Sequence, residues 1–385
     1  MQEKRRPTIN KRALFLLCLL IVNVWLLSMT GCSSKKSPIV IHVVGQMSGV
    51  GSELAVSGRR GIELAIDHIN QSGGVLGRSL ELKVLDLNEK AQTPKLAFEA
   101  ISKTANALVI GPFTSGNLID ALPVIEQSGD EILVLSPTVS ADSLSGKDDN
   151  ILRVMPSTAQ QAKLLTQWLD ANALNSNIVV YDRRNKGYTD LLVKNYVELH
   201  SAKTGEKPLV LPYDPSNPDE FNQVEAQILS VRPKSVTLIC SAEDSAYLIQ
   251  QASIKGLQTQ WLGALWANTS ELIKKGGDAV ENMILVNAID PNNESEAYLD
   301  FALAYKNRFG EGHSFSSVYS YESVFALKQA IEIAKSTEPS ALKGAFVSLG
   351  AFNGLQTTIE IDAYGDCNRA FYLSRIVDGQ LRKVE

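Results

Sequence analysis

Cysteine and histidine are scarce in this chain of 385 residues, which contains four of each. The cysteines form no Cys-x-x-Cys pair and the histidines lie far apart in the sequence, so a zinc or dithiol redox site has no support. The chain also lacks the Gly-x-Ser-x-Gly, His-Glu-x-x-His and Gly-x4-Gly-Lys-Ser/Thr motifs of hydrolases, metalloproteases and phosphate-binding loops. We therefore expect no enzyme, no metal and no cofactor.

An excess of basic charge is missing as well. The chain has 37 Lys and Arg against 42 Asp and Glu, which gives a net charge of −5 and a pI of about 5.6. Nucleic acid is therefore not an expected partner, because phosphate binding needs a basic face. With 44% hydrophobic and 21% charged residues, the composition is that of a globular protein long enough for two domains.

Only one long apolar run stands out, at residues 13–27, and it follows a basic stretch. This run is shorter than the roughly 20 residues that a membrane span needs, and it fits the hydrophobic region of a secretory signal. The sequence Leu-Ser-Met-Thr-Gly-Cys at 27–32 then resembles the lipobox of bacterial lipoproteins. The resemblance implies a signal peptide over 1–31, a lipid anchor on Cys32 and a tether over 32–37. The alternative is a signal anchor that is never cut.

Cleavage before Cys32 would remove five basic residues and one acidic residue, leaving a mature net charge of −9. Cys18 would leave with the signal, and Cys240 and Cys367 would remain in the globular part. These two cysteines form either one disulfide or two free thiols, and we favour free thiols.

From Pro38 onward, short β-branched runs alternate with amphipathic segments. The predicted strands are 39–44, 80–85, 107–110, 132–135, 178–181 and 235–240. The predicted helices are 54–70, a segment starting at Pro94, a segment from about residue 117, 189–200, 219–231 and 244–255. The apolar face expected for the second helix is Leu96, Ala97, Ala100 and Ile101, after a Thr93 N-cap. This alternation predicts an α/β fold whose parallel sheets bind ligands beyond the carboxyl ends of their strands.

Small and hydroxyl residues follow three of these strands, at 45–51, 111–116 and 136–140. Hydroxyls and free backbone N–H groups at the start of a helix can bind an anion, because donors and the positive end of the helix dipole converge there. These loops therefore predict a site for a carboxylate. The alternative is that Thr114, Ser115 and Ser140 only cap their helices.

Several segments together resemble type I periplasmic binding proteins, and most closely the leucine/isoleucine/valine-binding group that serves ABC importers. These segments are Gly-Gln-Met-Ser-Gly at 45–49, Gly-Ile-Glu-Leu-Ala-Ile at 61–66, residues 69–78, Val-Ile-Gly-Pro at 109–112, residues 136–138, Tyr-Ser-Tyr-Glu-Ser-Val at 319–324 and residues 361–366. The resemblance covers residues 38–385. It implies two doubly wound parallel-sheet lobes, joined by a three-strand hinge, which close over a ligand. The implied lobes are 38–156 plus 288–350, and 157–287 plus 351–385.

The resemblance also implies site residues. The ligand carboxylate of the family is held by two loops that correspond to Ser115, Thr138 and Ser140. The positions that depart from the family pattern fall on Leu54, Lys186 with the nearby Tyr188, Ser241 or Ala242, and Leu265. Trp266, next to Leu265, is a further candidate for lining the cleft. Lys186 is alternatively a solvated loop lysine, and Trp266 alternatively packs at the rim of the cleft.

Leu265 stands where the family has the acidic residue that pairs with the ligand ammonium. An unpaired buried ammonium costs several kcal/mol, which argues against a simple α-amino acid in the family's usual pose. Glu243 or Asp244, in the neighbouring loop, is a candidate substitute for that acidic residue. The alternative is that both cap the helix that follows.

The function expected from these features is that of a monomeric substrate-binding lipoprotein of an ABC importer. It would lie outside the cytoplasm, anchored by lipid to a bacterial membrane. It would bind a small carboxylate-bearing solute, such as an amino acid or related compound, and deliver it to permease subunits. The alternative is a ligand-sensing or scaffolding lipoprotein that keeps the fold without a transport role.

The lipobox interpretation predicts the fate of Cys32→Ser. Without the thiol no lipid is attached, and cleavage before residue 32 does not follow. We expect an uncut precursor that incorporates no labelled fatty acid, detected by gel mobility and acyl labelling. Normal acyl labelling of the variant would contradict the interpretation.

Overall fold

The computed structural model describes residues 36–48, 52–87, 92–175 and 177–384. The chain divides into two units, Met1–Ser37 and Pro38–Glu385. The predicted signal peptide, Cys32 and the first residues of the tether lie outside the described residues, as do 49–51 of the first loop. None of the helices in the described part of the chain is long and apolar enough to cross a membrane.

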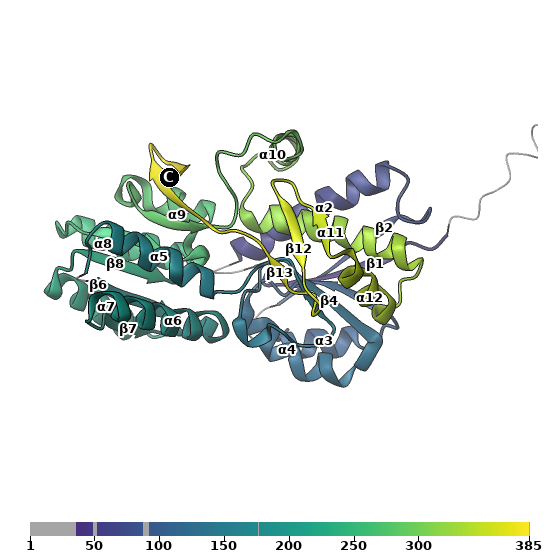
Figure 1. Cartoon of the computed structure of the whole chain (residues 1–385), viewed down its shortest axis with the longest axis horizontal. Coiled ribbons are helices and arrows are strands. Elements are labelled where there is room, and N and C mark those ends of the chain that lie inside the picture. Colours follow the sequence, from purple (N-terminus) through teal and green to yellow (C-terminus); the bar gives the residue numbers. More distant parts are fainter. Residues whose placement is uncertain (1–35, 49–51, 88–91, 176, 385) are drawn as a thin grey trace, which may run out of the picture. The chain divides into compact units, whose positions relative to one another are not determined.

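The first sheet of the second unit has five parallel strands in the order β2-β1-β3-β4-β5 (Figure 1). They are β1 Ile39–Gly45, β2 Leu80–Asp86, β3 Ala107–Ile110, β4 Ile132–Ser136 and β5 Ile151–Arg153. Alternate residues of the buried strand β3 enter different cores, because successive side chains of a strand point to opposite faces. Leu108 and Ile110 join the core that includes the helices α2 Glu53–Gln71 and α11 Phe315–Ala334, whereas Val109 joins the other core.

Helices α3 Pro94–Ile101 and α4 Ser115–Gln127 contribute to that other core, so both faces of the sheet are covered. Further along the chain, α10 Glu296–Phe309 contacts α2, and α12 Pro339–Leu349 contacts α11 and β4. Sheets covered in this way need apolar strands throughout, which explains the continuous β-branched runs.

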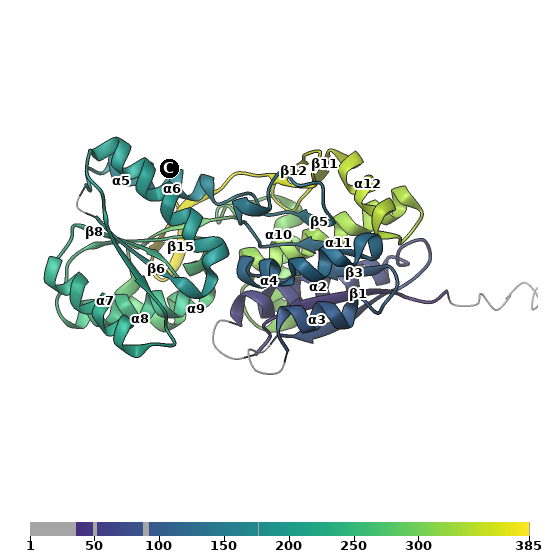
Figure 2. The same ribbon diagram turned by 90° about the horizontal axis from the view of Figure 1, so that it is seen from below.

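The second sheet has seven strands in the order β15-β14-β10-β9-β8-β6-β7 (Figure 2). They are β6 Asn177–Asp182, β7 Leu209–Tyr213, β8 Ser235–Ile239, β9 Gln260–Gly263, β10 Ile284–Asn287, β14 Tyr372–Val377 and β15 Gln380–Lys383. Strands β6 to β10 pair in parallel, and β14 and β15 are added antiparallel at one edge. The helices of this part are α5 Ala159–Ala171, α6 Lys186–Thr204, α7 Pro218–Val231, α8 Ala242–Ile254 and α9 Ser270–Gly276. A small antiparallel sheet joins β11 Ala351–Asn353, β12 Thr358–Ile361 and β13 Cys367–Asn368.

The predicted α/β fold with doubly wound parallel sheets is confirmed, and three local predictions need correction. Helix α4 begins at Ser115 rather than near residue 117, because the Thr114 side chain caps the Asn117 N–H. Helix α6 starts at Lys186 and ends at Thr204, beyond the predicted 189–200 at both ends. The apolar face of α3 is Ala97, Phe98 and Ile101, whereas Leu96 and Ala100 are exposed. The larger aromatic side chain takes the buried position, and the Thr93 cap is confirmed.

Helices α2 and α11 approach closely because small residues line their contact. A Cβ atom on Gly61 would lie 2.1 Å from the backbone oxygen of Ser317, so only glycine fits there. Toward the N-terminal ends of both helices, the Ser316 hydroxyl donates to the Leu54 carbonyl oxygen at 2.7 Å. These contacts fix Leu54 and Phe315 at the same end of the helix pair.

Two ion pairs bind the segment around β13 to the first sheet and its helices. Arg153 of β5 donates through Nε to Asp366 Oδ1 at 2.8 Å. Arg369 donates through Nη1 to Glu322 Oε2 on α11 at 2.6 Å, and its guanidinium lies 3.8 Å from the centre of the Tyr319 ring. The chain is therefore anchored to this part just before it enters β14 of the second sheet.

The Glu322–Arg369 pair predicts a large effect of Glu322→Gln. Both side chains are almost fully buried, at 2% and 3% exposure, so the variant leaves a buried guanidinium without a counter-ion. We expect a loss of about 3–5 kcal/mol in the free energy of unfolding, measured with urea. Glu332→Gln, which breaks an exposed pair with Lys328 on the same helix, should change it by less than about 0.5 kcal/mol. Equal effects of the two variants would contradict the argument.

Candidate functional site

A small pocket of about 30 Å³ lies where the loops after β3 and β4 meet loops of the second sheet. The residues that line it are Leu54, Phe113, Thr114, Ser115, Thr138, Ser140, Asn185, Tyr188, Leu265, Trp266 and Phe315. The first sheet and its helices supply hydroxyl and apolar groups, and the turns after β6 and β9 supply Asn185, Tyr188, Leu265 and Trp266. The pocket is therefore at the carboxyl ends of parallel strands, where the sequence predicts a ligand site.

The structure brings most of the predicted site residues together in this pocket: Leu54, Ser115, Thr138, Ser140, Tyr188, Leu265 and Trp266. Lys186 does not line it, because it is the exposed first residue of α6. Ser241 does not line it either, because it is the N-cap of α8 and its hydroxyl accepts from the Asp244 N–H at 3.2 Å. The roles of all nine residues in binding a ligand stay predictions.

The hydroxyl groups of the loops after β3 and β4 differ in their hydrogen bonds. Thr138 Oγ1 donates to the Phe113 carbonyl oxygen at 2.6 Å, which joins the two loops. Thr114 caps α4, as the capping alternative proposes. Among the residues that the structure describes, no hydrogen-bond partner is found for the hydroxyls of Ser115 and Ser140, although the two residues are only 3% and 2% exposed. These two hydroxyls can therefore bond a ligand without losing an internal bond.

Asn185 joins the second-sheet side of the pocket to the start of α4. Its Oδ1 accepts from the Gly116 N–H at 3.0 Å. This bond satisfies one of the N–H groups that the first turn of a helix leaves without an intrahelical partner. Asn185 is a site residue that the sequence analysis missed, because its local pattern gives no sign of a partner on α4.

A buried glutamine, Gln161 of α5, connects two of the lining residues without lining the pocket itself. Its Oε1 accepts from the Tyr188 hydroxyl at 2.8 Å and from the Leu265 N–H at 3.1 Å. Burial raises the pKa of Tyr188, so this hydroxyl stays protonated and acts as a donor. Tyr188 also packs edge-on against Trp266, with 6.2 Å between the ring centres. No sequence pattern indicated a role for Gln161, Phe113 or Phe315, although Phe113 lies within a predicted site loop.

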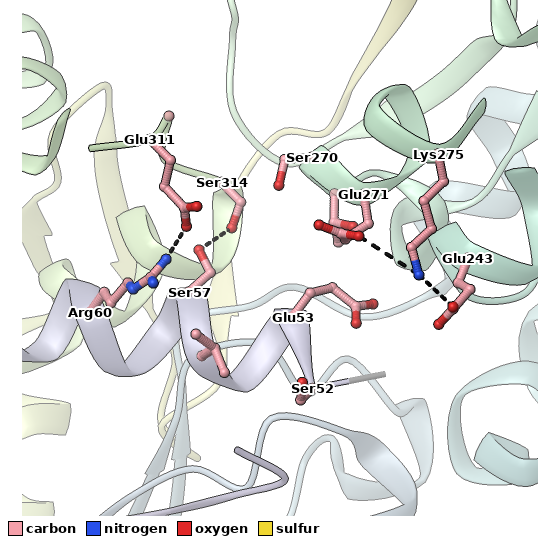
Figure 3. Close-up of a pocket in the computed structure, with 13 residues that line it drawn as sticks. Ser52, Glu53, Ser57, Arg60, Glu243, Ser270, Glu271, Lys275, Glu311 and Ser314 are labelled. Atoms are coloured by element: carbon pink, nitrogen blue, oxygen red, sulfur yellow. Dashed lines mark hydrogen bonds and ion pairs between the residues drawn. The ribbon is translucent and has the colours of Figure 1, made fainter. Parts of the chain in front are cut away.

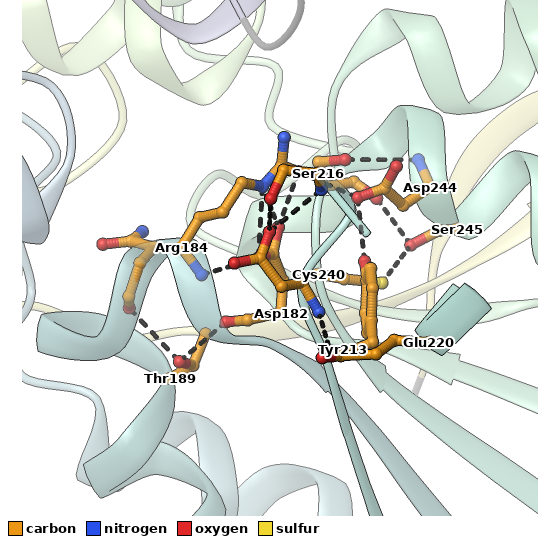
Figure 4. A network of polar contacts seen from close by, with 12 residues as sticks. Asp182, Arg184, Thr189, Tyr213, Ser216, Glu220, Cys240, Asp244 and Ser245 are labelled. Carbon is orange, nitrogen blue, oxygen red and sulfur yellow. Dashed lines mark hydrogen bonds and ion pairs between the residues drawn. The ribbon is translucent and has the colours of Figure 1, made fainter. Parts of the chain in front are cut away.

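A polar network around Asp182 holds the turn from β6 to α6 that carries Asn185 and Tyr188 (Figure 4). The buried Asp182 carboxylate accepts from Arg184 Nη2 at 2.6 Å, and the same guanidinium group donates to Asp244 at 2.9 Å. The Tyr213 hydroxyl also donates to Asp244, at 2.8 Å. The Asp244 carboxylate thus already accepts hydrogen bonds from Arg184 and Tyr213, and Asp244 does not line the small pocket. Burial raises the pKa of this carboxyl.

Cys240 lies beside this network, 3.2 Å from the Ser245 hydroxyl. Burial raises the pKa of its thiol, so the reactive thiolate form is disfavoured. Cys240 and Cys367 are both free, which confirms the interpretation as two thiols.

Residues 38–380 match the periplasmic binding protein family. The chain belongs to this family. The Leu/Ile/Val-binding protein BraC3 of Rhizobium johnstonii is 26% identical over 309 residues, which cover 78% of this chain and 80% of that protein. The leucine-, isoleucine-, valine-, threonine- and alanine-binding protein of Pseudomonas aeruginosa is 23% identical over 320 residues, with 81% and 83% covered.

Solved structures of this kind share the fold. The leucine binding protein LivK of Thermotoga maritima has a TM-score of 0.78 at 20% identity, with 90% of this chain and 98% of that chain covered. A solute binding protein of an R. palustris ABC transporter, in complex with benzoate, has a TM-score of 0.79 at 18% identity, with 90% and 95% covered. The resemblance to type I periplasmic binding proteins is thereby confirmed, and the relatives are binding proteins rather than enzymes.

The small pocket of this periplasmic binding protein contains no carboxylate among its described lining residues. Leu265 is 4% exposed and belongs to the main apolar core. An ammonium group at this position would meet a leucine side chain, as the sequence analysis anticipates.

The shared acceptor predicts a structural role for Gln161. Gln161→Leu removes the acceptor of two buried donors, the Tyr188 hydroxyl and the Leu265 N–H, and each unsatisfied donor costs about 1–3 kcal/mol. We expect a loss of about 2–5 kcal/mol in the free energy of unfolding with urea. Gln167→Leu changes an exposed residue of the same helix and should leave that free energy within about 0.5 kcal/mol of wild type. A small effect of Gln161→Leu would show that the two bonds do not support the pocket.

Proposed function

We propose that this chain is the solute-binding subunit of an ABC importer and binds a small carboxylate-bearing solute between two lobes. The observation that carries this proposal is the pair of hydroxyls of Ser115 and Ser140, which face one pocket and have no partner among the described residues. Family membership supports the binding role.

The start of α4 favours an anion at this place. Ser115 is the first residue of a helix of 13 residues, whose N-terminal dipole attracts negative charge. Hydroxyl donors on two neighbouring loops add charge-assisted hydrogen bonds to a carboxylate. A carboxylate is also common to isoleucine, which a Streptococcus pneumoniae relative binds in its solved structure, and to benzoate in the R. palustris structure.

The rest of the pocket suits an apolar group. Leu54, Phe113, Leu265, Trp266 and Phe315 line it. Its volume of about 30 Å³ is far below the roughly 300 Å³ or more of ordinary ligand pockets, so a solute of amino-acid size enters only when the lobes move apart. We propose that a hinge motion of the lobes opens and closes this pocket.

The proposed lobes are built on the two sheets. The chain passes from one proposed lobe to the other at three points, and we keep the first two of these crossings near residues 156 and 287. We place the third crossing after Arg369 rather than at residue 351, because 351–369 is bonded to α11 and β5. Strands β14 and β15 then belong to the second lobe.

We also propose that the mature protein begins at a lipid-bearing Cys32, lies outside the cytoplasm and works as a monomer with membrane permease subunits. The lipobox of residues 27–32 supports the anchor, and the family supports the location. The second candidate function is a ligand-sensing or scaffolding lipoprotein, which Leu265 favours because the acidic residue is missing there.

The proposed carboxylate site is tested by Ser115→Ala and Ser140→Ala. Each variant should weaken carboxylate binding by about 1–3 kcal/mol, because each removes a charge-assisted hydrogen bond. Binding is measured by calorimetry after a thermal-shift screen with leucine, isoleucine, benzoate and short aliphatic acids. Ser128→Ala, at the other end of α4, is the control and should not change the affinity.

Unchanged affinity in both variants would remove the proposed carboxylate site. A folded protein that responds to none of these carboxylates would favour the sensing or scaffolding function instead.

A further inference from the structure

A second and larger pocket, of about 510 Å³, is lined by neighbours of the small-pocket residues (Figure 3). Glu53 lines it next to Leu54 in the sequence, and Ser314 lines it next to Phe315. The opposite wall comes from α8 and from the start of α9. The same segments therefore contribute to both pockets, and we call this larger one the acidic pocket.

The charges of the acidic pocket do not balance. Four glutamates and two basic residues line it: Glu53, Glu243, Glu271, Glu311, Arg60 and Lys275. Lys275 pairs with Glu243, Arg60 pairs with Glu311, and Glu271 lies 3.8 Å from Lys275 and pairs at 3.2 Å with Lys274, which does not line the pocket. Glu53 forms no ion pair within the described part of the chain. One carboxylate in the pocket is thus left without a cation.

One oxygen of the half-buried Glu53 carboxylate lacks a hydrogen bond in the part of the chain that the structure describes. Its Oε1 is buried and has no partner among the described residues, and Figure 3 shows the side chain pointing from α2 toward Lys275 and Glu243. Burial raises the pKa of this carboxyl, and the charges of Glu243 and Glu271 raise it further. A hydrogen bond from the backbone N–H of Glu53 and the charge of Lys275 oppose this rise only in part. Buried polar atoms without partners are rare in folded proteins, so this one calls for an explanation.

Thr269 provides an independent sign of a ligand. Its side chain is 7% exposed and lines the acidic pocket, and its Oγ1 has no hydrogen-bond partner in the described chain. A hydroxyl and a carboxylate that both lack partners can accept from one group with several N–H donors. A primary ammonium has three such donors and also supplies the missing positive charge.

We propose that Glu53, assisted by Thr269, binds the primary ammonium group of a solute. The proposal rests on the carboxylate site proposed above: with a carboxylate at Ser115 and Ser140, the solute is an aminocarboxylate whose two charged groups are further apart than in an α-amino acid. This solute class explains how the pocket functions with Leu265 in place of an acidic residue. A metal ion is not the expected cation, because no group of three or more His, Cys, Asp or Glu side chains in the described residues is arranged to hold one.

The test compares three series of probes on the purified protein by calorimetry. The first series is γ-aminobutyrate, δ-aminovalerate and ε-aminocaproate, and the second is butyrate, valerate and caproate. The third is the alkylamines of the same chain lengths. We expect at least one ω-amino acid to bind about tenfold or more tightly than the acid without the amine. Glu53→Gln should remove this preference and leave the affinity for the simple acids unchanged.

A matched control is Glu63→Gln, which removes the same charge from the same helix outside the acidic pocket. It should leave all affinities at the wild-type value. In the absence of any probe, Glu53→Gln should melt at the wild-type temperature or above it, because the variant removes a half-buried carboxylate whose Oε1 has no hydrogen-bond partner among the described residues and whose pKa is raised by burial. A melting temperature well below wild type would assign Glu53 a structural role and overturn the proposal.

The outcomes separate this proposal from the proposed function. Equal binding of acids and amino acids, unaffected by Glu53→Gln, would overturn the ammonium site and leave the carboxylate site standing. Alkylamine binding that depends on Glu53, with no response to simple acids, would support the ammonium site and remove the carboxylate site. If no compound of the three series binds, the ammonium site is overturned. The ammonium site is also overturned if calcium raises the melting temperature and Glu53→Gln abolishes this rise.

Discussion

Parallel strands that are covered on both faces carry mainly apolar side chains. Polar groups that bind a ligand therefore lie mainly beyond the carboxyl ends of the strands. Strands β3 and β4 are buried along their whole length, so the hydroxyls of Ser115 and Ser140 lie beyond their ends. The second sheet follows the same constraint, with Asp182 at the end of β6 and Tyr213 at the end of β7. Residues just beyond the strand ends contribute to both pockets, with Ser115 and Ser140 in the small pocket and Glu243 in the acidic pocket.

The groups at this edge are held in place by residues that do not line the small pocket. Gln161 accepts from Tyr188 and Leu265 through one oxygen, and Arg184 joins the carboxylates of Asp182 and Asp244. These acceptor oxygens are hydrogen-bonded, whereas Glu53 Oε1, Thr269 Oγ1 and the Nε2 group of Gln161 have no partner among the described residues. Of these three residues, Glu53 and Thr269 line the acidic pocket.

Local sequence patterns were sufficient for the Thr93 cap and for strands β1, β2, β3, β4, β6 and β8, since each depends on neighbours within a few residues. The remaining strands were not predicted. They could not place Phe98 rather than Leu96 in the core, because the rotation of α3 is set by packing against distant strands. Strand β14 pairs with β10, with Ile284 opposite Arg375, and β15 pairs with β14, so the place of this antiparallel pair in the sheet is set by residues distant in the sequence. The family resemblance located seven lining residues of the small pocket. The acidic pocket could not be predicted from local sequence patterns, because its lining residues come from four separate segments of the chain.

Glu53 and Leu54 are adjacent in the first turn of α2 yet line different pockets. The helix N-terminus favours the charged form of Glu53, whereas burial and the nearby glutamates oppose it. A cation that binds beside Glu53 stabilises the charged carboxylate against the effect of burial and of the nearby glutamates. Binding of the cation is therefore coupled to the position of the first turn of α2. Because the same turn presents Leu54 to the small pocket, an ammonium at Glu53 and an apolar chain against Leu54 would be recognised by one rigid element. Separating the two charges of a solute across this turn would favour extended aminocarboxylates over compact ones.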